Sequence, residues 1–588
     1  MKGLLNDTRD SKTLMKVAIG EDKADLAIVN ARLVNVYTRE LLDDHAISIK
    51  GKWIAYVGNN IENTIGPQTE VIDAKGSTVI PGLIDGHTHI AWMYTVSEFL
   101  KYVIKGGTTT VVTETMEPFA IAGYAGVVDF LKSLNHQPIK ILATAPVMIS
   151  ISQAARGISK ETVQKLLERD EIIGLGESYW QAVLQEPDLL LPLFEQTLQD
   201  GKSIEGHTAG ASEKKLAAYV ANGVSSCHES INAEQVLSRL RMGLHIMIRE
   251  GSIRRDLEDI AKIKDNGIDL RRLILVTDGA SSVDLIEKGY MDYVVQKAID
   301  SGFNPIAAIQ MATLNVAEHF SLDGLIGGIA PGRYADLVII PDINTIDAQV
   351  VISNGNVVAR DGDLLAAPRE HRFTNESLNS VHLSKKLDPS DFVIKAPNAA
   401  DQVQVRVIEM ITDLVTAEAE LNWPVNNSEL KADADQDMLK IAAVDRTHNP
   451  GKMFVGFVKG FGMKSGAMAC SAAWDTSDII IVGASDADMA TAVNRIGALQ
   501  GGSVVCENGN VIAELPMPIF GLVSDLPMEA IAQKSQELKD AVSNLGVPFP
   551  DPFLSLIVLT GAAIPYFRIC EEGLVNLKDG KKLPLFVK

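Results

Sequence analysis

The chain has 588 residues, too many for one hydrophobic core, so two or three domains are expected. Its hydrophobic content of 46% and charged content of 22% are those of a globular protein, and sparse aromatics beside abundant Gly, Ala, Val and Ile favour an α/β architecture. The net charge of −21 argues against nucleic acid or an anionic membrane as a partner, because both bind clustered Lys and Arg.

Targeting and redox signals are missing from the sequence. Residues 1–7 lack the apolar core of a signal peptide, and no uninterrupted apolar run reaches about 18 residues, the length of a membrane span. The four cysteines are widely scattered and form no Cys-x-x-Cys pair, so the chain is not a disulfide scaffold. We therefore expect an enzyme with reduced thiols in the cytoplasm.

Both flanks of the first 365 residues are predicted to be rich in short strands. Apolar runs at 27–30, 46–49 and 53–57 are punctuated by glycine turns, and a similar set returns at 335–340, 350–355 and 356–359. We expect residues 1–80 and 331–365 to join into one small β-sandwich domain.

Between these flanks, in residues 81–330, apolar strands alternate with helical stretches. The candidate strands are 77–80, 109–113, 139–145, 172–175, 203–205, 223–225, 245–248 and 273–276, and the candidate helices include 161–169, 212–221, 233–241, 286–301 and 305–312. Eight strands with intervening helices over about 250 residues predict a (β/α)₈ barrel, in which chemistry lies at the carboxyl ends of the strands.

The first candidate strand leads into a pair of histidines. His87 and His89 are separated by one residue, so on a strand both project to the same side and can bind one metal ion. Imidazole suits zinc, iron, manganese and nickel, so the pair does not name the metal. By itself His-x-His is a weak signal, because two nearby histidines are common on surface strands.

Further polar residues follow the later strands, and any one of them alone has an ordinary structural interpretation. Together they supply ligands for two metals: His87, His89 and Asp278 for the first, His207 and His228 for the second, and Glu177 shared. Such a centre generates a bridging hydroxide near neutral pH. Asp278 is then expected to accept the hydroxide proton and return it to the leaving nitrogen.

At these residues the chain resembles the prokaryotic adenine deaminase family of the amidohydrolase superfamily. The resemblance rests on Asp85–His89, 174–177, 206–210, His228–Glu229, 248–252, Thr277–Asp278, 330–336, 459–462, 515–519 and 521–522. It implies hydrolytic deamination of adenine to hypoxanthine and ammonia, as in purine salvage, on a binuclear centre that usually holds manganese or iron, with zinc as an alternative. It also implies a homo-oligomer.

Several family positions carry other residues here. Ala91 and Trp92 replace the family's Glu-Ser, Met116 stands within Glu114–Glu117 in place of His, Gly279 replaces an Asp, and Trp474–Asp478 replaces His-Asp-Ser-His-Asn. Two alternatives to adenine deamination therefore stay open. One is an amidohydrolase acting on another purine, cyclic amidine or amide, and the other is a barrel-fold binding protein without catalysis.

Four more residues are candidates for catalysis or substrate binding. Arg249 and Glu250 follow a strand and are expected to orient the substrate ring, with a structural ion pair at the barrel rim as the alternative. Glu229, beside His228, is a candidate proton carrier or a support for the metal ligands. Asp475 is expected to close over the pocket, with an exposed loop as the alternative.

The last third of the chain is predicted to be separate from the barrel. Residues 366–393 are polar and irregular and are expected to form a linker. Residues 394–588 are expected to form an α+β domain of the kind peculiar to the adenine deaminase family, with helices at 408–420, 487–500 and 528–545.

Overall fold

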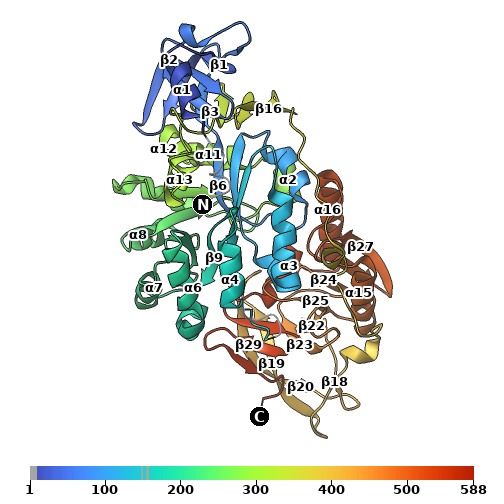
Figure 1. The fold of residues 1–588 in the computed structure, drawn as a ribbon. Helices are drawn as coiled ribbons and strands as arrows, with labels where there is room; N and C mark the ends of the chain where they lie inside the picture. Colours follow the sequence, from blue (N-terminus) through green and yellow to red (C-terminus); the bar gives the residue numbers. More distant parts are fainter. Residues whose placement is uncertain (1–8, 148–149, 154–157, 588) are drawn as a thin grey trace.

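The computed structural model describes residues 9–147, 150–153 and 158–587. The N-terminal residues considered for a signal peptide lie outside this part. Figure 1 shows a strand-rich region at the top of the molecule, a central barrel, and a C-terminal region, coloured yellow to red, below and to the right of the barrel. Among the described residues, no helix is long and apolar enough to cross a membrane.

The barrel is built from eight parallel strands. Five of them form one sheet: β6 (Leu83–Thr88), β7 (Thr108–Thr113), β8 (Lys140–Ala145), β9 (Ile172–Tyr179) and β10 (Ser203–His207). The others are β11 (Ser226–Cys227), β12 (His245–Arg249) and β13 (Leu273–Val276). The two sheets meet at β10 with β11 and at β13 with β6, which closes the ring and confirms the predicted fold class.

Helices surround the barrel, and several of them begin at side-chain caps. Thr95, Ser159 and Asn232 each accept a hydrogen bond from the backbone N–H three residues later, which satisfies a free donor at the helix start. The helices include α2 (Val96–Val103), α3 (Met116–Leu134), α4 (Lys160–Leu167), α6 (Pro187–Gln199), α7 (Glu213–Val220), α8 (Ala233–Leu240), α12 (Pro305–Met311) and α13 (Leu314–His319).

Three predicted elements of the barrel were misplaced. The strand predicted at 77–80 is β5 (Thr78–Pro81), which belongs to the small sheet, and the first barrel strand is β6. The strand predicted at 223–225 lies three residues later, as β11. The single helix predicted at 286–301 is two, α10 (Ser282–Glu287) and α11 (Met291–Asp300), because Gly289 adopts a φ of 98° that breaks the helix.

The two β-rich flanks form one nine-stranded sheet. The N-terminal strands are β1 (Leu26–Asn35), β2 (Glu40–Lys50), β3 (Trp53–Gly58), β4 (Glu70–Asp73) and β5, and the returning strands are β14 (Leu337–Ile340), β15 (Val350–Ser353), β16 (Asn356–Arg360) and β17 (Asp363–Leu364). They are joined by antiparallel pairing of β5 with β14. The boundary between this sheet and the barrel is only one residue wide, at Gly82, so the sheet is directly continuous with β6.

The C-terminal region is built on an eight-stranded sheet. Its strands are, in spatial order, β20 (Thr416–Pro424), β19 (Gln402–Met410), β23 (Met453–Lys459), β22 (Met438–Asp445), β25 (Asp478–Gly483), β24 (Ala467–Cys470), β26 (Gly502–Glu507) and β27 (Asn510–Pro516). A small sheet of β28 (Phe567–Cys570), β29 (Gly573–Asn576) and β30 (Lys581–Leu583) follows. The predicted helices at 487–500 and 528–545 are present as α15 (Asp486–Leu499) and α16 (Met528–Asn544).

The helix predicted at 408–420 was wrong. β19 and β20 occupy this stretch as an antiparallel pair, with Val407 opposite Ala419. In β19 the buried residues Val403, Val405 and Val407 recur with period two, the pattern of a half-buried strand, and β-branched residues favour it. The prediction included only the end of this alternation.

The predicted linker packs against the barrel. It contains α14 (Asn375–Leu378) and a short 3₁₀ helix (Pro389–Phe392). Asp129, on α3, accepts hydrogen bonds from the Ser377 hydroxyl at 2.6 Å and the Thr374 N–H at 2.8 Å. The barrel and C-terminal region also share backbone bonds, from Met93 N–H to Leu522 O at 3.1 Å and from Ser524 N–H to Met93 O at 2.9 Å. These contacts place the C-terminal region over one end of the barrel.

Candidate metal centre and active site

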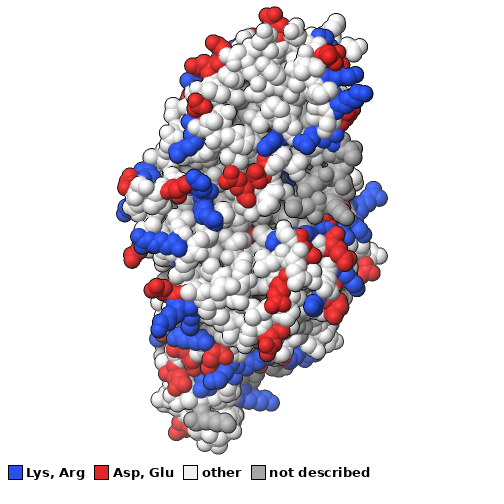
Figure 2. All heavy atoms as spheres, turned by 60° about the vertical axis from the view of Figure 1, so that its left-hand side comes forward, with Lys and Arg blue, Asp and Glu red and all other residues white. Residues whose placement is uncertain are grey.

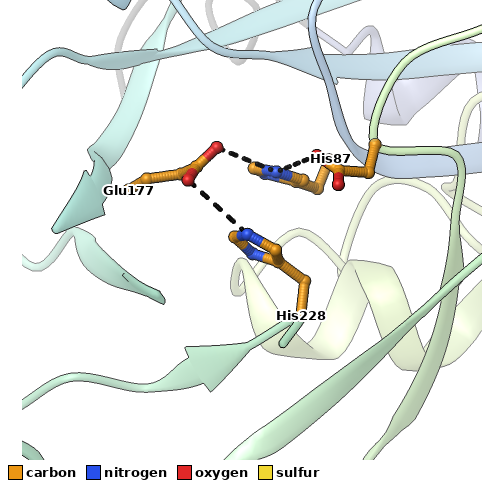
Figure 3. A group of neighbouring side chains, drawn as sticks. His87, Glu177 and His228 are labelled. Carbon is orange, nitrogen blue, oxygen red and sulfur yellow. Dashed lines mark ion pairs between the residues drawn. The ribbon is translucent and has the colours of Figure 1, made fainter. Parts of the chain in front are cut away.

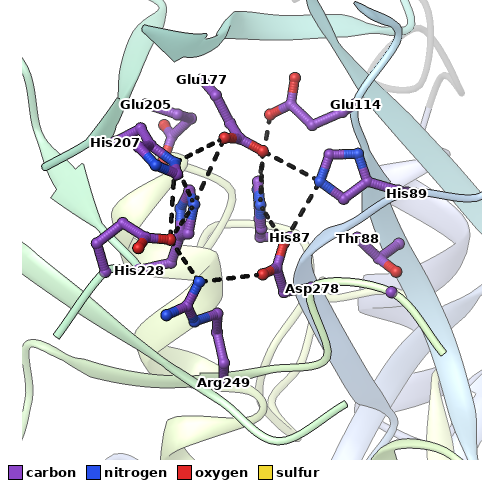
Figure 4. A network of polar contacts seen from close by, with 12 residues as sticks. His87, Thr88, His89, Glu114, Glu177, Glu205, His207, His228, Arg249 and Asp278 are labelled. Carbon is purple, nitrogen blue, oxygen red and sulfur yellow. Dashed lines mark hydrogen bonds and ion pairs between the residues drawn. The ribbon is translucent and has the colours of Figure 1, made fainter. Parts of the chain in front are cut away.

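The six predicted ligands converge at the carboxyl ends of the barrel strands (Figure 4). Each is at most 6% exposed: His87 on β6, His89 just after it, Glu177 on β9, His207 on β10, His228 just after β11 and Asp278 just after β13. Parallel strands bring their carboxyl ends to one face, which is why residues nearly 200 positions apart meet here.

Glu177 stands between two pairs of histidines. Its Oε1 lies 3.0 Å from His89 Nε2 and 3.4 Å from His87 Nε2. Its Oε2 lies 2.9 Å from His207 Nδ1 and 3.5 Å from His228 Nε2. Figure 3 shows the carboxylate directed toward His87 with one oxygen and toward His228 with the other. One oxygen for each pair is the arrangement of a carboxylate that bridges two cations.

Asp278 faces the first pair of histidines. Its Oδ1 lies 3.2 Å from His87 Nε2 and 3.3 Å from His89 Nε2, and its N–H donates to His87 O at 3.1 Å. The residue adopts a φ of 56°, which Asp tolerates better than most side chains. The preceding Thr277 donates to Asp85 Oδ2 at 2.6 Å, so the ends of β13 and β6 are tied together beside the site.

The donor set fits divalent cations. Within the described part of the chain, the Nε2 atoms of His87, His89 and His207 are buried without a hydrogen-bond partner, a costly state for a polar atom unless something else binds it. Two groups have ligand atoms within 4.8 Å of one another: His87, Glu177, His228 and Asp278, and His207, His228 and Glu229. His228 thus lies near both groups, and Glu229 near the second. Imidazole with carboxylate is a donor set that suits zinc, manganese and iron.

The electrostatics of the site also favour added positive charge. Burial by itself would lower the pKa of His87, yet the carboxylates of Asp278 and Glu177 raise it to about 10. For the carboxylates the effect of burial is the reverse: it would raise the pKa of Glu177 and of Asp278. The surrounding histidines nevertheless hold both pKa values well below the usual range. The carboxylates thus stabilise positive charge on the neighbouring imidazoles, and the same negative potential would stabilise divalent cations bound there.

Arg249 joins the second half of the site to Asp278. Its guanidinium donates to Glu229, lies 3.0 Å from Asp256 Oδ2, and lies 3.4 Å from Asp278 Oδ2. The arginine is 4% exposed, so these pairs are shielded from water. Glu229 Oε1 is also 3.4 Å from His228 Nε2. Arg249 and Glu229 therefore both lie within the predicted cluster.

Glu250, the remaining predicted substrate contact, is not brought to this cluster. Successive residues on a strand point to opposite faces, so its side chain leaves the side that Arg249 occupies. Its Oε1 accepts from the Tyr293 hydroxyl at 3.2 Å and pairs with Lys297 Nζ at 3.0 Å on α11. The structure places Glu250 in the ion pair that was the alternative interpretation.

Two carboxylates near the histidines were missed. Glu117 Oε1 lies 2.5 Å from His89 Nδ1, on the ring edge opposite the site, and this contact orients the imidazole. Glu114 Oε1 lies 3.6 Å from His87 Nδ1, and burial raises the pKa of Glu114 to about 7. Glu114 directly follows β7, so the strand-end rule applied to the other ligands could have found it. Glu117 is on the first turn of α3, where that rule gives no signal.

A cavity of about 260 Å³ opens on the cluster and is lined by both the barrel and the C-terminal region. The C-terminal lining is Thr412, Asp413, Leu414, Val415, Trp474, Val558, Gly561, Ala563, Ile564 and Pro565. Trp474 packs edge-on against His89, with ring centres 6.1 Å apart, and lies 6.2 Å from Trp92. Two of the residues that depart from the family pattern therefore lie beside a predicted ligand.

Asp475 is buried at this junction, 4% exposed, and not in an exposed loop. Its Oδ1 accepts from the Tyr179 hydroxyl at 3.2 Å and its Oδ2 from the Ala562 N–H at 2.7 Å. Burial raises the pKa of Asp475 to about 7. The side chain supports the wall of the cavity, beside the pocket that Trp474 lines.

Comparison with known proteins identifies both parts of the chain. Residues 78–359 match the model of the amidohydrolase family, and residues 413–581 match that of the adenine deaminase C-terminal domain. The chain is 35% identical to the adenine deaminase of Clostridium botulinum strain Langeland and 37% identical to that of Moorella thermoacetica, covering 98% of both chains in each comparison.

Among solved structures, the chain is similar to enamidase, a member of the amidohydrolase superfamily, at 21% identity and a TM-score of 0.45, covering 59% of this chain and 98% of that one. It is also similar to the β-aspartyl dipeptidase of Fervidobacterium islandicum at 18% identity and a TM-score of 0.46, covering 58% and 97%. The full-length identity to the curated relatives carries the assignment: this chain belongs to the adenine deaminase family of amidohydrolases.

Proposed function

We propose that this protein deaminates adenine by hydrolysis, giving hypoxanthine and ammonia, and that it does so with two divalent metal ions, manganese or iron foremost and zinc as an alternative. The bridging position of Glu177 between two histidine pairs carries the metal part of the proposal. The relatives named adenine deaminase, 35% and 37% identical over 98% of the chain, support the substrate.

The two ions would be held as the sequence suggested. His87, His89 and Asp278 would bind the first, His207 and His228 the second, and Glu177 both. Bound metals of this kind supply an activated water and polarise the carbon under attack. The position of Glu229, 3.4 Å from His228 Nε2, suits a support for this ligand set better than direct contact with substrate.

Asp278 is the residue we assign to proton transfer. The carbon of an aromatic amidine needs a strong nucleophile, and its amino group must be protonated before it leaves. Asp278 Oδ1 points toward the centre while Oδ2 faces Arg249 at 3.4 Å, and the contacts with His87 and His89 together with the charge of Arg249 hold its pKa well below the usual range, so the carboxylate is ionised. It would accept the proton of the attacking water and deliver it to the departing nitrogen.

A second candidate substrate class follows from the two tryptophans. Trp92 and Trp474 give an apolar wall beside His89, where family members typically carry polar residues. Such a wall favours another purine, cyclic amidine or amide with an apolar edge directed at it. A binding protein without catalysis is the third alternative, and an inability to bind divalent metal would favour it.

The deciding experiment is ammonia release from a panel of purines by manganese-loaded protein, with Asp278→Asn as the control. Release from adenine that disappears in the variant would support deamination and a requirement for Asp278. Two bound metals per chain without release from any purine would contradict adenine as the substrate and favour the second class.

The predicted cytoplasmic location and homo-oligomer, and the predicted lack of a nucleic-acid or membrane partner, stay predictions. On the face drawn in Figure 2, basic and acidic side chains are interspersed.

A further inference from the structure

Two loops of the C-terminal region form the roof of the cavity over the metal centre. We call residues 412–416 and 561–565 the roof loops, because Thr412, Asp413, Leu414, Val415, Gly561, Ala563, Ile564 and Pro565 line that cavity. The loops are about 150 residues apart in sequence, and they meet through backbone bonds from Thr416 N–H to Pro565 O at 3.3 Å and from Tyr566 N–H to Thr416 O at 3.1 Å. The Thr416 hydroxyl adds two bonds just beyond the second loop, because it donates to Phe567 O at 2.6 Å and accepts from Phe567 N–H at 3.1 Å.

Arg568, the second residue of β28, lies behind both roof loops. Its guanidinium is fully buried, and its donors end on roof-loop backbone: Nε on Gly561 O at 3.2 Å, and Nη2 on Leu414 O at 3.1 Å, Ile564 O at 2.5 Å and Pro565 O at 3.1 Å. Nη1 donates to the Thr416 hydroxyl at 2.7 Å and to Phe567 O at 3.3 Å. Both loops are therefore bound by one rigid, planar group.

The absence of a charge partner makes this arrangement unusual. None of the described carboxylates forms an ion pair with Arg568, although a buried cation is ordinarily paired. A buried cation surrounded by carbonyl dipoles and a hydroxyl is stable where several of them point at it, and removing it would leave those acceptors buried without donors. The energetic benefit of Arg568 is therefore tied to holding the roof loops together.

The roof loops are also held from the cavity side. Asp475 accepts from the N–H of Ala562, whose preceding carbonyl, that of Gly561, accepts from Arg568. Asp475 in turn accepts from Tyr179 at the end of barrel strand β9. A continuous chain of hydrogen bonds thus runs from the barrel through the second roof loop to Arg568.

We propose that Arg568 is a positioning residue, which binds the two roof loops to each other and thereby sets the height of the substrate pocket above the metal centre. This inference rests on the proposed deamination for its kinetic readout. Because Arg568 bonds none of the predicted ligands and does not line the cavity, its loss should alter substrate binding through the roof loops and leave the metals in place.

The test compares Arg568→Met, Arg568→Lys and Thr416→Val in the full-length, manganese-loaded protein. Arg568→Met is expected to raise the KM for adenine about tenfold or more with a smaller change in kcat and two metals still bound, since displaced walls weaken substrate placement. Lysine keeps the charge but offers only three donors from one point, so the KM of Arg568→Lys should lie between those of Arg568→Met and wild type. Thr416→Val removes the hydroxyl that accepts from Arg568 and also bonds the backbone of Phe567, and it should raise KM by a smaller factor.

Arg406→Met is the matched control. Arg406 also donates to backbone carbonyls in the C-terminal region, those of Pro584 at 3.0 Å and Phe586 at 3.3 Å, but these do not line the cavity. Its KM should stay at the wild-type value. An unchanged KM in folded Arg568→Lys and Thr416→Val, or an equal rise in Arg406→Met, would overturn the proposal.

Backbone hydrogen exchange separates this inference from the proposed reaction. Peptides covering 412–416 and 561–567 should exchange faster in the Arg568 and Thr416 variants, while those covering α15 keep their wild-type protection. If wild-type protein releases no ammonia from adenine, the proposed substrate fails and this exchange pattern still tests the role of Arg568. A uniform increase in exchange over the whole chain, or no increase at the roof loops, would contradict the positioning role of Arg568.

Discussion

The hydroxyl of Tyr179 lies 3.2 Å from Oδ1 of Asp475 and so joins the end of barrel strand β9 to the C-terminal region. Both side chains are buried, Tyr179 at 3% and Asp475 at 4% exposure. Tyr179 is two residues beyond Glu177, the proposed bridging ligand, so the C-terminal region is attached directly beside the candidate metal centre. The active site of this family member is thus completed by a part of the chain that is not in the barrel.

Removing this attachment should weaken substrate binding. Tyr179→Phe deletes one hydrogen bond, and we expect the KM for adenine to rise about threefold to tenfold. Asp475→Ala also leaves the buried Ala562 N–H without an acceptor, so the rise should be larger, about tenfold to a hundredfold. Steady-state kinetics measure both, and an equal KM in wild type and Asp475→Ala would contradict a role for this contact.

Glu117 should control metal retention through His89. Its carboxylate, 2.5 Å from His89 Nδ1, fixes the ring and increases the basicity of the opposite nitrogen. Glu117→Gln keeps the shape but removes the charge, and we expect metal affinity to fall about tenfold to a hundredfold. Metal content after dialysis against a chelator gives the answer. Glu213→Gln, on an exposed turn of α7, is the control that should retain metal like the wild type.

Arg249 and Glu250 are adjacent in sequence, but we expect substitution of Arg249 to reduce activity strongly and substitution of Glu250 to leave it nearly unchanged. Arg249→Met leaves Glu229 buried without its arginine and Asp256 with only Arg254, so kcat should fall by about a hundredfold or more. Glu250→Gln breaks only the contact with Lys297, away from the cavity, and should leave the KM for adenine within about twofold of wild type. A large KM increase in Glu250→Gln would restore it as a substrate contact.

The convergence of the six candidate ligands could be predicted from the sequence because its signal is local. In a parallel barrel, the residue after each strand lies at the common carboxyl face, so His207, His228 and Asp278 could be placed without knowing any long-range contact. The same reasoning cannot reach Asp475, whose contact with Tyr179 spans 296 residues and depends on how two regions pack. The helix predicted at 408–420 was wrong for a similar reason. Pairing between β19 and β20 determines the strands there, and such pairing is not visible in a short apolar run.

Glu205 lies two residues before His207 on β10, so its side chain also enters the barrel (Figure 4). There it pairs with His319 and does not line the cavity. Both Glu205 oxygens lie within 3.0 Å of His319 Nε2, and Ser226 donates to Oε2 at 2.5 Å. Burial would raise the pKa of Glu205, but the His319 charge and these hydrogen bonds lower it to about 2. The carboxylate therefore stabilises the barrel core beneath the metal centre as long as it is ionised.

This pairing predicts an acid-dependent loss of stability. The folded pKa of about 2 lies below the ordinary value of 4.5, so the folded state binds fewer protons than the unfolded state between those values. The contribution, about 3 kcal/mol, is complete above pH 4.5 and is lost as the pH falls through 2. Glu205→Gln lacks it, so its urea midpoint should be well below that of wild type at pH 7, and the gap should narrow steadily toward pH 3. The exposed Glu213→Gln should follow wild type at every pH, and a gap that does not change with pH would mean that Glu205 acts through packing and not through its charge.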